Sequence, residues 1–423
     1  MKFGQDNKYK VIVHNTTYLS VLEILKMVMP FVALPYLIST VGADKYGLVV
    51  FAQAIISYFI IFINFGLDVS AVKNVSINRS DNEKLSEVVS SVLIIKAFLF
   101  ILSFLALGVL LLCVKQFRDN YVLFLLSFLS CLSEILFPVW FYQGVEKMKY
   151  ITLIRFTSIF FYTVTVFIFI KNESDYLLIP LLQSLGWLLS GVISFFMLIR
   201  VEKISLFVPT IESIRRYFKE SVPFFVSRVS VVINASMAKT ICGIFFSMHE
   251  VAVFDLAQKI ASVIAMTALV PLQMLNQALF PHIAKTLDRK FVNKCFRLIL
   301  LATGCIIVIV YILAPFAVFV LSDGKLPESV DILHVFSLFI FSGGITSFTG
   351  SPVLVSFGYS KPFNRSVVLS TFVLIVIYMV LYFTNSFSII NFALALGFAE
   401  FVIAIYRLYY CNRYKLIMLY GRV

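Results

Sequence analysis

Charged side chains are scarce in this chain. Of its 423 residues, 13% are Asp, Glu, Lys or Arg and 61% are hydrophobic, and the mean hydropathy is +0.97. A water-soluble protein of this length could not bury so much apolar surface, which excludes a soluble globular fold. Acids are rarer than bases, 22 against 35. The bases stand singly between apolar runs, which is typical of membrane orientation signals and argues against a nucleic-acid partner.

Signatures of catalysis and metal binding are also missing. The six cysteines lie in or beside apolar segments and form no CxxC pair, so neither zinc nor a disulfide framework is indicated. The loops are short and leave no room for a soluble catalytic domain. We therefore expect no enzymatic activity, no metal and no cofactor. The first apolar run is longer than a signal-peptide core and lacks a small-x-small cleavage site, so we expect an uncleaved span.

Long apolar runs are what the sequence has instead. Most have 20 to 30 residues, the length of a tilted transmembrane helix. They predict an all-α polytopic membrane protein with about twelve transmembrane helices. The runs are 11–40, 46–68, 88–114, 121–143, 150–171, 177–199, 220–247, 251–280, 295–321, 331–357, 363–384 and 387–410.

The loop charges predict the orientation of these spans. A six-residue turn carrying Gly42, Asp44 and Lys45 separates the first two runs. Five of the 35 Lys and Arg residues lie in the loops of one side, seven lie within spans, and all others lie in loops of the opposite side. Because cytoplasmic loops carry the excess of Lys and Arg, both termini are expected in the cytoplasm.

A polar interruption near residue 200 divides the spans six and six. We predict an N-terminal six-helix bundle at 1–200, a cytoplasmic amphipathic linker at 201–219 containing IESIRRYFKE, and a C-terminal six-helix bundle at 220–423. FAQAI in the second span of the first half matches LAQKI in the second span of the other half. This match and the equal span counts indicate two pseudo-symmetric bundles, a common transporter plan.

Several stretches resemble a known family. LPYLISTVGADKYGLVVFAQAI, FGLDVSAVK and FPVWFYQGVEKMKYITLIRF in the first half, with SVPFFVSRVSVVI, AQKIASVI and PLQMLNQALFPHIAK in the second, resemble the O-antigen-type oligosaccharide-lipid flippases of the multidrug/oligosaccharidyl-lipid/polysaccharide exporter superfamily. The resemblance implies a V-shaped transporter in the cytoplasmic (inner) membrane. It would carry undecaprenyl-diphosphate-linked oligosaccharide across through a cationic cavity, among membrane lipids. An O-antigen polymerase and a chain-length regulator are the protein partners considered.

Basic residues within spans are candidates for contacting such an anion. A cation at a helix centre costs about 2.5–3.5 kcal/mol, so the deep ones should face a wet cavity or an acid. Arg228 and Lys239 are eleven residues apart, close to three turns, and should share one helix face. Buried ion pairing and snorkelling are the alternatives. The candidate cations are Lys26, Arg228, Lys239, Arg155, Lys96 and Lys259.

Acids within or beside the spans are candidates for ion coupling or gating. Glu23 lies three residues before Lys26, and Asp255 lies four before Lys259, so structural pairing is the alternative. Proline at 138 can bend its span and free a backbone carbonyl. The run GGITSFTGSP at 343–352 is small and polar, which favours close helix packing, with a hinge or a sugar-contacting wall as the alternative. The candidate acids are Glu23, Glu134, Asp68, Asp255 and Glu400.

Three other functions agree with parts of this pattern. A flippase for capsule, teichoic acid or peptidoglycan precursors would share these features. A cation-coupled drug antiporter of the same superfamily fits less well, because bases outnumber acids inside the spans. A polymerase or glycosyltransferase would need a sizeable external loop, and the external loops here are short.

Overall fold

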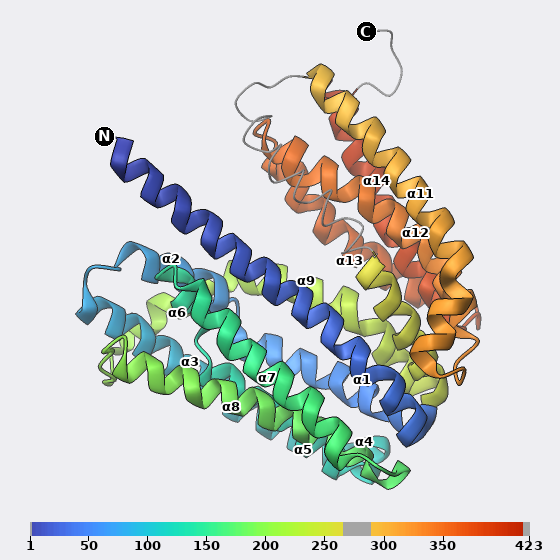
Figure 1. Ribbon diagram of the computed structural model, residues 1–423, viewed down its shortest axis with the longest axis horizontal. Coiled ribbons are helices and arrows are strands. Elements are labelled where there is room, and N and C mark those ends of the chain that lie inside the picture. Colours follow the sequence, from blue (N-terminus) through green and yellow to red (C-terminus); the bar gives the residue numbers. More distant parts are fainter. Residues whose placement is uncertain (1, 265–288, 418–423) are drawn as a thin grey trace. The chain divides into compact units, whose positions relative to one another are not determined.

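The computed structural model describes residues 2–264 and 289–417, and the regular secondary structure in those ranges is helical. No strand occurs within those ranges (Figure 1). Within them, nine helices are long and apolar enough to cross a membrane. These findings confirm the predicted all-α polytopic fold. The total of twelve spans, the V-shaped arrangement and the orientation of the termini stay predictions.

The chain divides into two compact units, Met1–Val232 and Ile233–Val423. The division falls inside helix α9, which runs from Ile211 to Phe245. The predicted linker 201–219 therefore ends in the first turns of α9, after a non-helical stretch at 201–210. The two-bundle boundaries expected from the sequence stay a prediction.

Unit 1 consists of the first nine elements and the beginning of α9. Helix α1 covers the first predicted run and most of the second, and a break divides the predicted run 121–143 between α5 and α6. The elements are α1 (Lys2–Asn64), α2 (Leu67–Ile77), α3 (Asn82–Cys113), α4 (Lys115–Asp119), α5 (Tyr121–Leu136), α6 (Val139–Gly144), α7 (Met148–Phe169), η1 (Glu173–Leu177) and α8 (Leu178–Arg200).

Helix α1 changes direction at Gly42 (Figure 1). Gly42 has φ 79° and ψ 161°, a conformation that only glycine adopts without strain. The six-residue turn expected here is wrong in extent, since Asp44 and Lys45 are already helical.

The core of unit 1 forms around a second break, between α5 and α6. The chain leaves the helix at Phe137 and Pro138, and Trp140, Phe141 and Tyr142 follow as buried residues of the core. Helices α2 and α3 pack against these rings. The hydroxyl of Tyr142 donates to a carbonyl of α8, so the polar atom of this buried ring is satisfied.

Unit 2 begins with the remainder of α9 and a helical stretch at 248–264. The second part of the predicted span 251–280 and the motif PLQMLNQALFPHIAK lie outside the described residues. The other elements are α11 (Arg289–Ser322), α12 (Ser329–Phe348), η2 (Thr349–Val355), α13 (Ser360–Phe383) and α14 (Ile389–Arg413). A hydrophobic core cluster of this unit joins α11, α12, η2 and α14.

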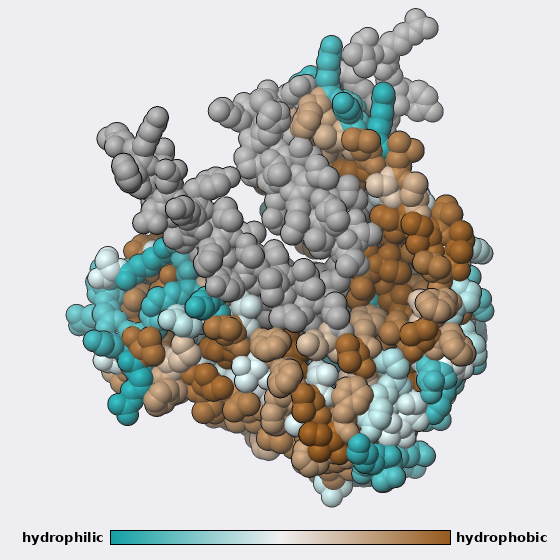
Figure 2. All heavy atoms as spheres, viewed as in Figure 1, coloured by the Kyte–Doolittle hydropathy of each residue, from teal (hydrophilic) through white to brown (hydrophobic). Residues whose placement is uncertain are grey.

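Large apolar side chains cover the outer faces of the spans. On α3 these include Phe98, Leu105 and Leu112, and on α11 they include Ile312 and Phe316, each more than half exposed. Figure 2 shows hydrophobic residues along the helix flanks and hydrophilic residues gathered toward the helix ends. Such faces are stable only against lipid, which agrees with a multi-pass membrane protein.

Candidate functional site

A buried polar cluster joins three helices of unit 1. The side chain of Lys96 on α3 is 2% exposed. Its Nζ donates to Oδ1 of Asn64 at 2.7 Å and to the backbone carbonyl of Glu134 at 2.8 Å. The Asn64 amide in turn donates to Oε2 of Glu134 at 3.0 Å. Lys96 is therefore held inside the bundle by two acceptors and does not face lipid.

The break after α5 explains why Lys96 is needed. Pro138 has no N–H, so it cannot bond the carbonyl four residues earlier, which is that of Glu134. The Lys96 ammonium donates to that carbonyl instead. An unpaired carbonyl at this depth would cost free energy, because no water is available inside a bilayer. The lysine thus completes a broken helix.

Arg155 on α7 extends the same cluster. Its guanidinium lies over the ring of Phe137, with 4.5 Å from Cζ to the ring centroid, and Glu134 is its favourable electrostatic partner. The cluster therefore contains two cations and one carboxylate. The expectation that Lys96 and Arg155 line a substrate cavity stays a prediction.

A second pair lies at the start of α2. Nη2 of Arg228 on α9 is 2.9 Å from Oδ2 of Asp68, and the two side chains are 45% and 36% exposed. Asp68 is in the first turn of α2, where the helix dipole favours a carboxylate. Arg228, which we expected to line the cavity, and Asp68, which we expected to act in coupling or gating, therefore contact each other.

Gly66 lets α9 approach α2 closely. A Cβ atom at this position would lie 2.6 Å from the amide nitrogen of Phe225 and 2.7 Å from the carbonyl oxygen of Ser221. Gly66 also has φ 71°, which disfavours any other residue. The ring of Phe65 stacks on Phe225 beside this contact. The close crossing brings Arg228 within reach of Asp68.

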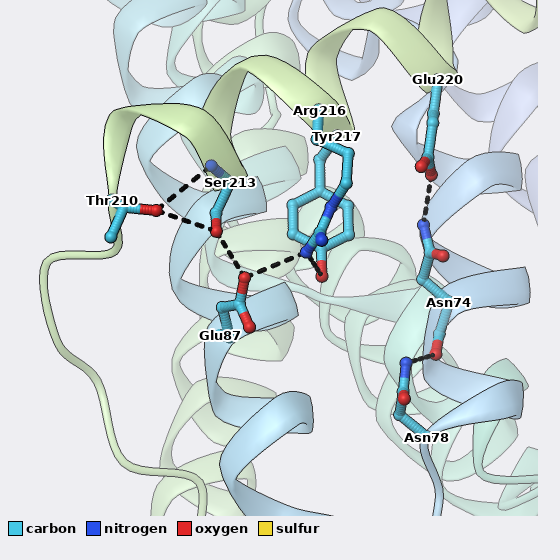
Figure 3. Close-up of polar contacts among 8 residues, drawn as sticks. All are labelled: Asn74, Asn78, Glu87, Thr210, Ser213, Arg216, Tyr217 and Glu220. Carbon is cyan, nitrogen blue, oxygen red and sulfur yellow. Dashed lines mark hydrogen bonds and ion pairs between the residues drawn. The ribbon is translucent and has the colours of Figure 1, made fainter.

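The first turns of α9 are bound to unit 1 by further polar contacts, which Figure 3 shows. Glu87 of α3 accepts from the hydroxyl of Ser213 and from Arg216, and Asn74 of α2 donates to Glu220. Arg216 also donates to the hydroxyl of Tyr217. Burial raises the pKa of Tyr217, so this hydroxyl stays protonated over the physiological range.

In unit 2, one buried carboxylate forms ion pairs with two lysines. Asp255 is 2% exposed, and its two carboxylate oxygens each lie 2.7 Å from a lysine ammonium, one of Lys239 on α9 and one of Lys259. The pairing of Asp255 with Lys259, foreseen as an i,i+4 contact, is present. The partnership with Lys239 was not foreseen, because it joins separate helices.

A further network surrounds the helix break at η2. The backbone leaves helical geometry at Gly350, and the carbonyl of Thr346 in the last turn of α12 accepts from Nη1 of Arg407 at 2.6 Å. Nε of Arg407 donates to Ser366 at 2.8 Å. The hydroxyl of Thr346 donates to Oε1 of Glu400 at 2.6 Å. The candidate acid Glu400 therefore belongs to a structural network of unit 2.

Arg407 was missed by sequence reasoning, which counted it among the cytoplasmic loop charges. It is 7% exposed and packs over the ring of Phe363. Its position inside the apolar run 387–410 was the signal that could have identified it. A Cβ on Gly350 would lie 2.8 Å from its Nη1, so the glycine makes room for the guanidinium.

The other candidates are less informative. Helix α1 contains Glu23 and Lys26, but their side chains lie outside what the structure describes. In residues 2–264 and 289–417, no group of three or more His, Cys, Asp or Glu side chains could hold a metal ion. Three of the four clusters lie where a span breaks, at 65–66, at 137–138 or at 350, and the cluster around Asp255 does not.

Taken with the lipid-facing helices, these buried polar clusters define an α-helical multi-pass membrane protein. Residues 12–287 match the family model described as "Polysaccharide biosynthesis protein", and the chain belongs to that family. The family and the fold expected from the quoted motifs are thus confirmed.

Two relatives are similar to this chain in sequence. The chain is 23% identical over 411 residues, 96% of its length and 97% of the relative's, to a protein of Escherichia coli (strain K12) named "Putative O-antigen transporter". It is 26% identical over 284 residues, 67% of its length and 68% of the relative's, to a protein of the same name from Shigella dysenteriae.

The solved structures show the fold. "Lipid II flippase MurJ, inward closed conformation" superposes with a TM-score of 0.72 at 15% identity, covering 95% of this chain and 87% of that one. An inward-facing "multidrug resistance MATE family transporter of the MOP superfamily" superposes with a TM-score of 0.69 at 14% identity, covering 95% and 98%.

Proposed function

We propose that this protein is a flippase that moves an undecaprenyl-diphosphate-linked oligosaccharide, of the O-antigen repeat type, across the cytoplasmic membrane by alternating access. The family match and the names of the two relatives support a polysaccharide-related transport role. A fold shared with a lipid II flippase is compatible with a lipid-linked cargo. The protein itself would then catalyse no covalent step.

The observation that carries this proposal is the excess of cations over acids inside the spans. In unit 1, the single carboxylate of Glu134 lies near two cations, Lys96 and Arg155. In unit 2, the single carboxylate of Asp255 pairs with two lysines. Each cluster keeps one positive charge beyond its carboxylate. Such charge is expensive in a membrane and suits a diphosphate, since Arg and Lys are the side chains that bind phosphate oxygens best.

Exposure ranks the cations for this role. Arg228 is 45% exposed and Lys259 is 35% exposed, whereas Lys239 is 18% exposed and Lys96 only 2%. We infer that Arg228, Lys259 and Lys239 exchange their carboxylate partners for substrate phosphates during transport. Lys96 acts mainly by completing the broken helix.

The acids would then hold the cations between transport events. Asp68 and Asp255 keep their partners ion-paired when no substrate is bound. Irregular backbone at membrane depth is stable only inside protein or beside a wet cavity. Transporters often place their binding sites at such breaks in spans. Coupling of transport to a cation or proton through Glu134 or Glu400 stays part of the proposal.

Complementation tests this function. The gene is expressed in a bacterium that lacks its own O-antigen flippase but makes the lipid-linked repeat, and surface polysaccharide is measured. We expect surface polysaccharide to be restored by the parent and by Arg118→Ala, which removes an exposed cation of α4. The variant Arg228→Ala/Lys239→Ala should fail at equal protein level.

Two results would redirect the assignment. Strains that make capsule, teichoic acid or peptidoglycan precursors replace the O-antigen strain in parallel, and rescue in one of these alone would change the cargo. Export of a fluorescent lipophilic cation, with no polysaccharide rescue in any strain, would indicate a drug antiporter instead.

A further inference from the structure

A second surface, separate from the buried clusters, lies between α8 and α9. Residues 201–210 form a non-helical segment that we call the linker strap. The strap runs along the start of α3. The amide of Ser205 donates to Oγ of Ser86 at 3.1 Å, and the amide of Phe207 donates to Oγ of Ser90 at 3.2 Å.

The spacing of these contacts shows that the strap is extended. The step of two residues from Ser205 to Phe207 spans about 6–7 Å of extended chain, and the step of four residues from Ser86 to Ser90 rises about 6 Å along the helix. Ile204 points inward and is 3% exposed. The backbone is thereby fixed on α3, with two serines supplying acceptors for two amides.

The outer edge of the strap is apolar. Leu206 and Phe207 are both 46% exposed, Val208 is 86% exposed, and Ile211 at the start of α9 is 78% exposed. Four large apolar side chains within six residues form a patch that water would not favour. We call these four residues the apolar edge.

The apolar edge continues a surface that already faces lipid. Phe196 on α8 is 61% exposed, and Val201, the first residue of the strap, is 52% exposed. Arg200 lies over the ring of Phe196, as expected for a cation reaching toward headgroups. The exposed cations Lys203, Arg215 and Lys219 flank the edge.

The length of α3 sets the depth of the strap. Its 32 residues span about 48 Å, longer than a hydrocarbon core of about 30 Å. The first large exposed apolar side chain on α3 is Phe98. Ser90 lies eight residues, about 12 Å, before it. The strap is therefore level with the headgroups, outside the hydrocarbon core.

We propose that the linker strap is an interfacial membrane anchor. The apolar edge inserts among the lipids of the leaflet that the loop charges assign to the cytoplasm, and the flanking cations contact anionic headgroups. This role goes beyond the proposed transport activity and does not depend on its cargo. It would fix the start of α9 to unit 1 and to the membrane together.

Tryptophan fluorescence in liposomes tests the anchor. Phe207→Trp and Val208→Trp place a reporter in the apolar edge, and the parent signal of Trp140 and Trp187 is subtracted. Two variants of α3 calibrate the assay, Leu105→Trp for the lipid core and Lys84→Trp for water. Quenching is measured with lipids brominated near the headgroup, with lipids brominated near the chain end, and with aqueous acrylamide.

The expected result is a blue-shifted reporter at 207 and 208 that headgroup-proximal bromine quenches more strongly than chain-end bromine. Leu105→Trp should show the opposite preference, and Lys84→Trp should respond to acrylamide alone. The proposal is overturned if the strap reporters behave like Lys84→Trp. It is also overturned if neither bromine nor acrylamide reaches them, because a protein partner would then cover the edge.

Discussion

The guanidinium of Arg228 lies 2.9 Å from the carboxylate of Asp68 and links α9 to the first turn of α2. Both side chains remain more than a third exposed. A pair with this exposure contributes little to folding, typically about 0–1 kcal/mol. The contact therefore has room to serve transport, because breaking it need not unfold the protein.

Exchanging the two charges separates pairing from transport. Asp68→Arg/Arg228→Asp should keep the thermal unfolding temperature in detergent near that of the parent, since opposite charges still face each other. We expect transport to be lost, because the cation now sits on α2. Arg228→Ala alone should likewise lose transport while costing less than about 1 kcal/mol of stability.

Transport by the charge-swapped protein at the parent's rate would show that only the pair matters. Arg228 would then be a structural residue. Arg215→Ala, which removes an exposed cation on the same helix, is the matched control and should transport normally.

Lys96 should prove structural. Lys96→Met leaves the Glu134 carbonyl and the Asn64 amide oxygen without their donor, at about 1–3 kcal/mol for each unsatisfied group. Pro138→Ala supplies a backbone N–H at the break. In a double-mutant cycle monitored by thermal unfolding, Pro138→Ala should recover part of the loss, with a coupling above about 0.5 kcal/mol. Strict additivity would contradict the compensation.

The two lysines of unit 2 should act redundantly on Asp255. Either Lys239→Met or Lys259→Met leaves the carboxylate one ammonium at hydrogen-bonding distance. The double variant leaves a buried carboxylate without either ammonium, and removing the charged partners of a buried ion costs about 3–5 kcal/mol. We expect the double variant to lower the unfolding temperature by more than the sum of the decreases in the two single variants. Adding Asp255→Asn to the double variant should restore stability, and failure to do so would disprove the pairing.

Arg407 should tolerate no substitution by lysine. Its Nε and Nη1 donate to Ser366 and Thr346 in a geometry that a single ammonium cannot reproduce. Arg407→Lys should therefore destabilise by about 1–3 kcal/mol, measured by thermal unfolding. Glu400→Gln should be much milder, because an amide oxygen can still accept from the Thr346 hydroxyl. Equal losses from both variants would argue against this network.

The sequence was a good guide to the fold because bilayer thickness dictates span length. Most residues of the predicted runs within the described ranges are helical, although helical geometry is interrupted inside the runs 46–68, 121–143 and 331–357, and the turn at Gly42 is where the chain bends. Its extent was wrong, because nothing in the sequence shows that one left-handed glycine can replace a whole turn. Pro138 was expected to bend a span, and it ends α5.

The site was harder to predict because its partners are distant in the chain. Residue identities suggested that Lys96 and Arg228 were costly and needed partners. They could not show that Lys96 would bond a carbonyl freed by a proline, or that Gly66 would let α9 reach Asp68. The local i,i+4 pair of Asp255 and Lys259 was foreseeable, since helix geometry alone places those side chains together.

Leaflet-specific accessibility tests the central claim most directly. Purified protein is reconstituted into liposomes with an undecaprenyl-diphosphate-linked oligosaccharide, and an impermeant glycosidase is added outside. The account predicts that the parent exposes the inner-leaflet pool to cleavage, whereas Arg228→Ala/Lys239→Ala liposomes lose only the outer pool, as protein-free liposomes do. Cleavage confined to the outer pool with the folded parent would contradict the account.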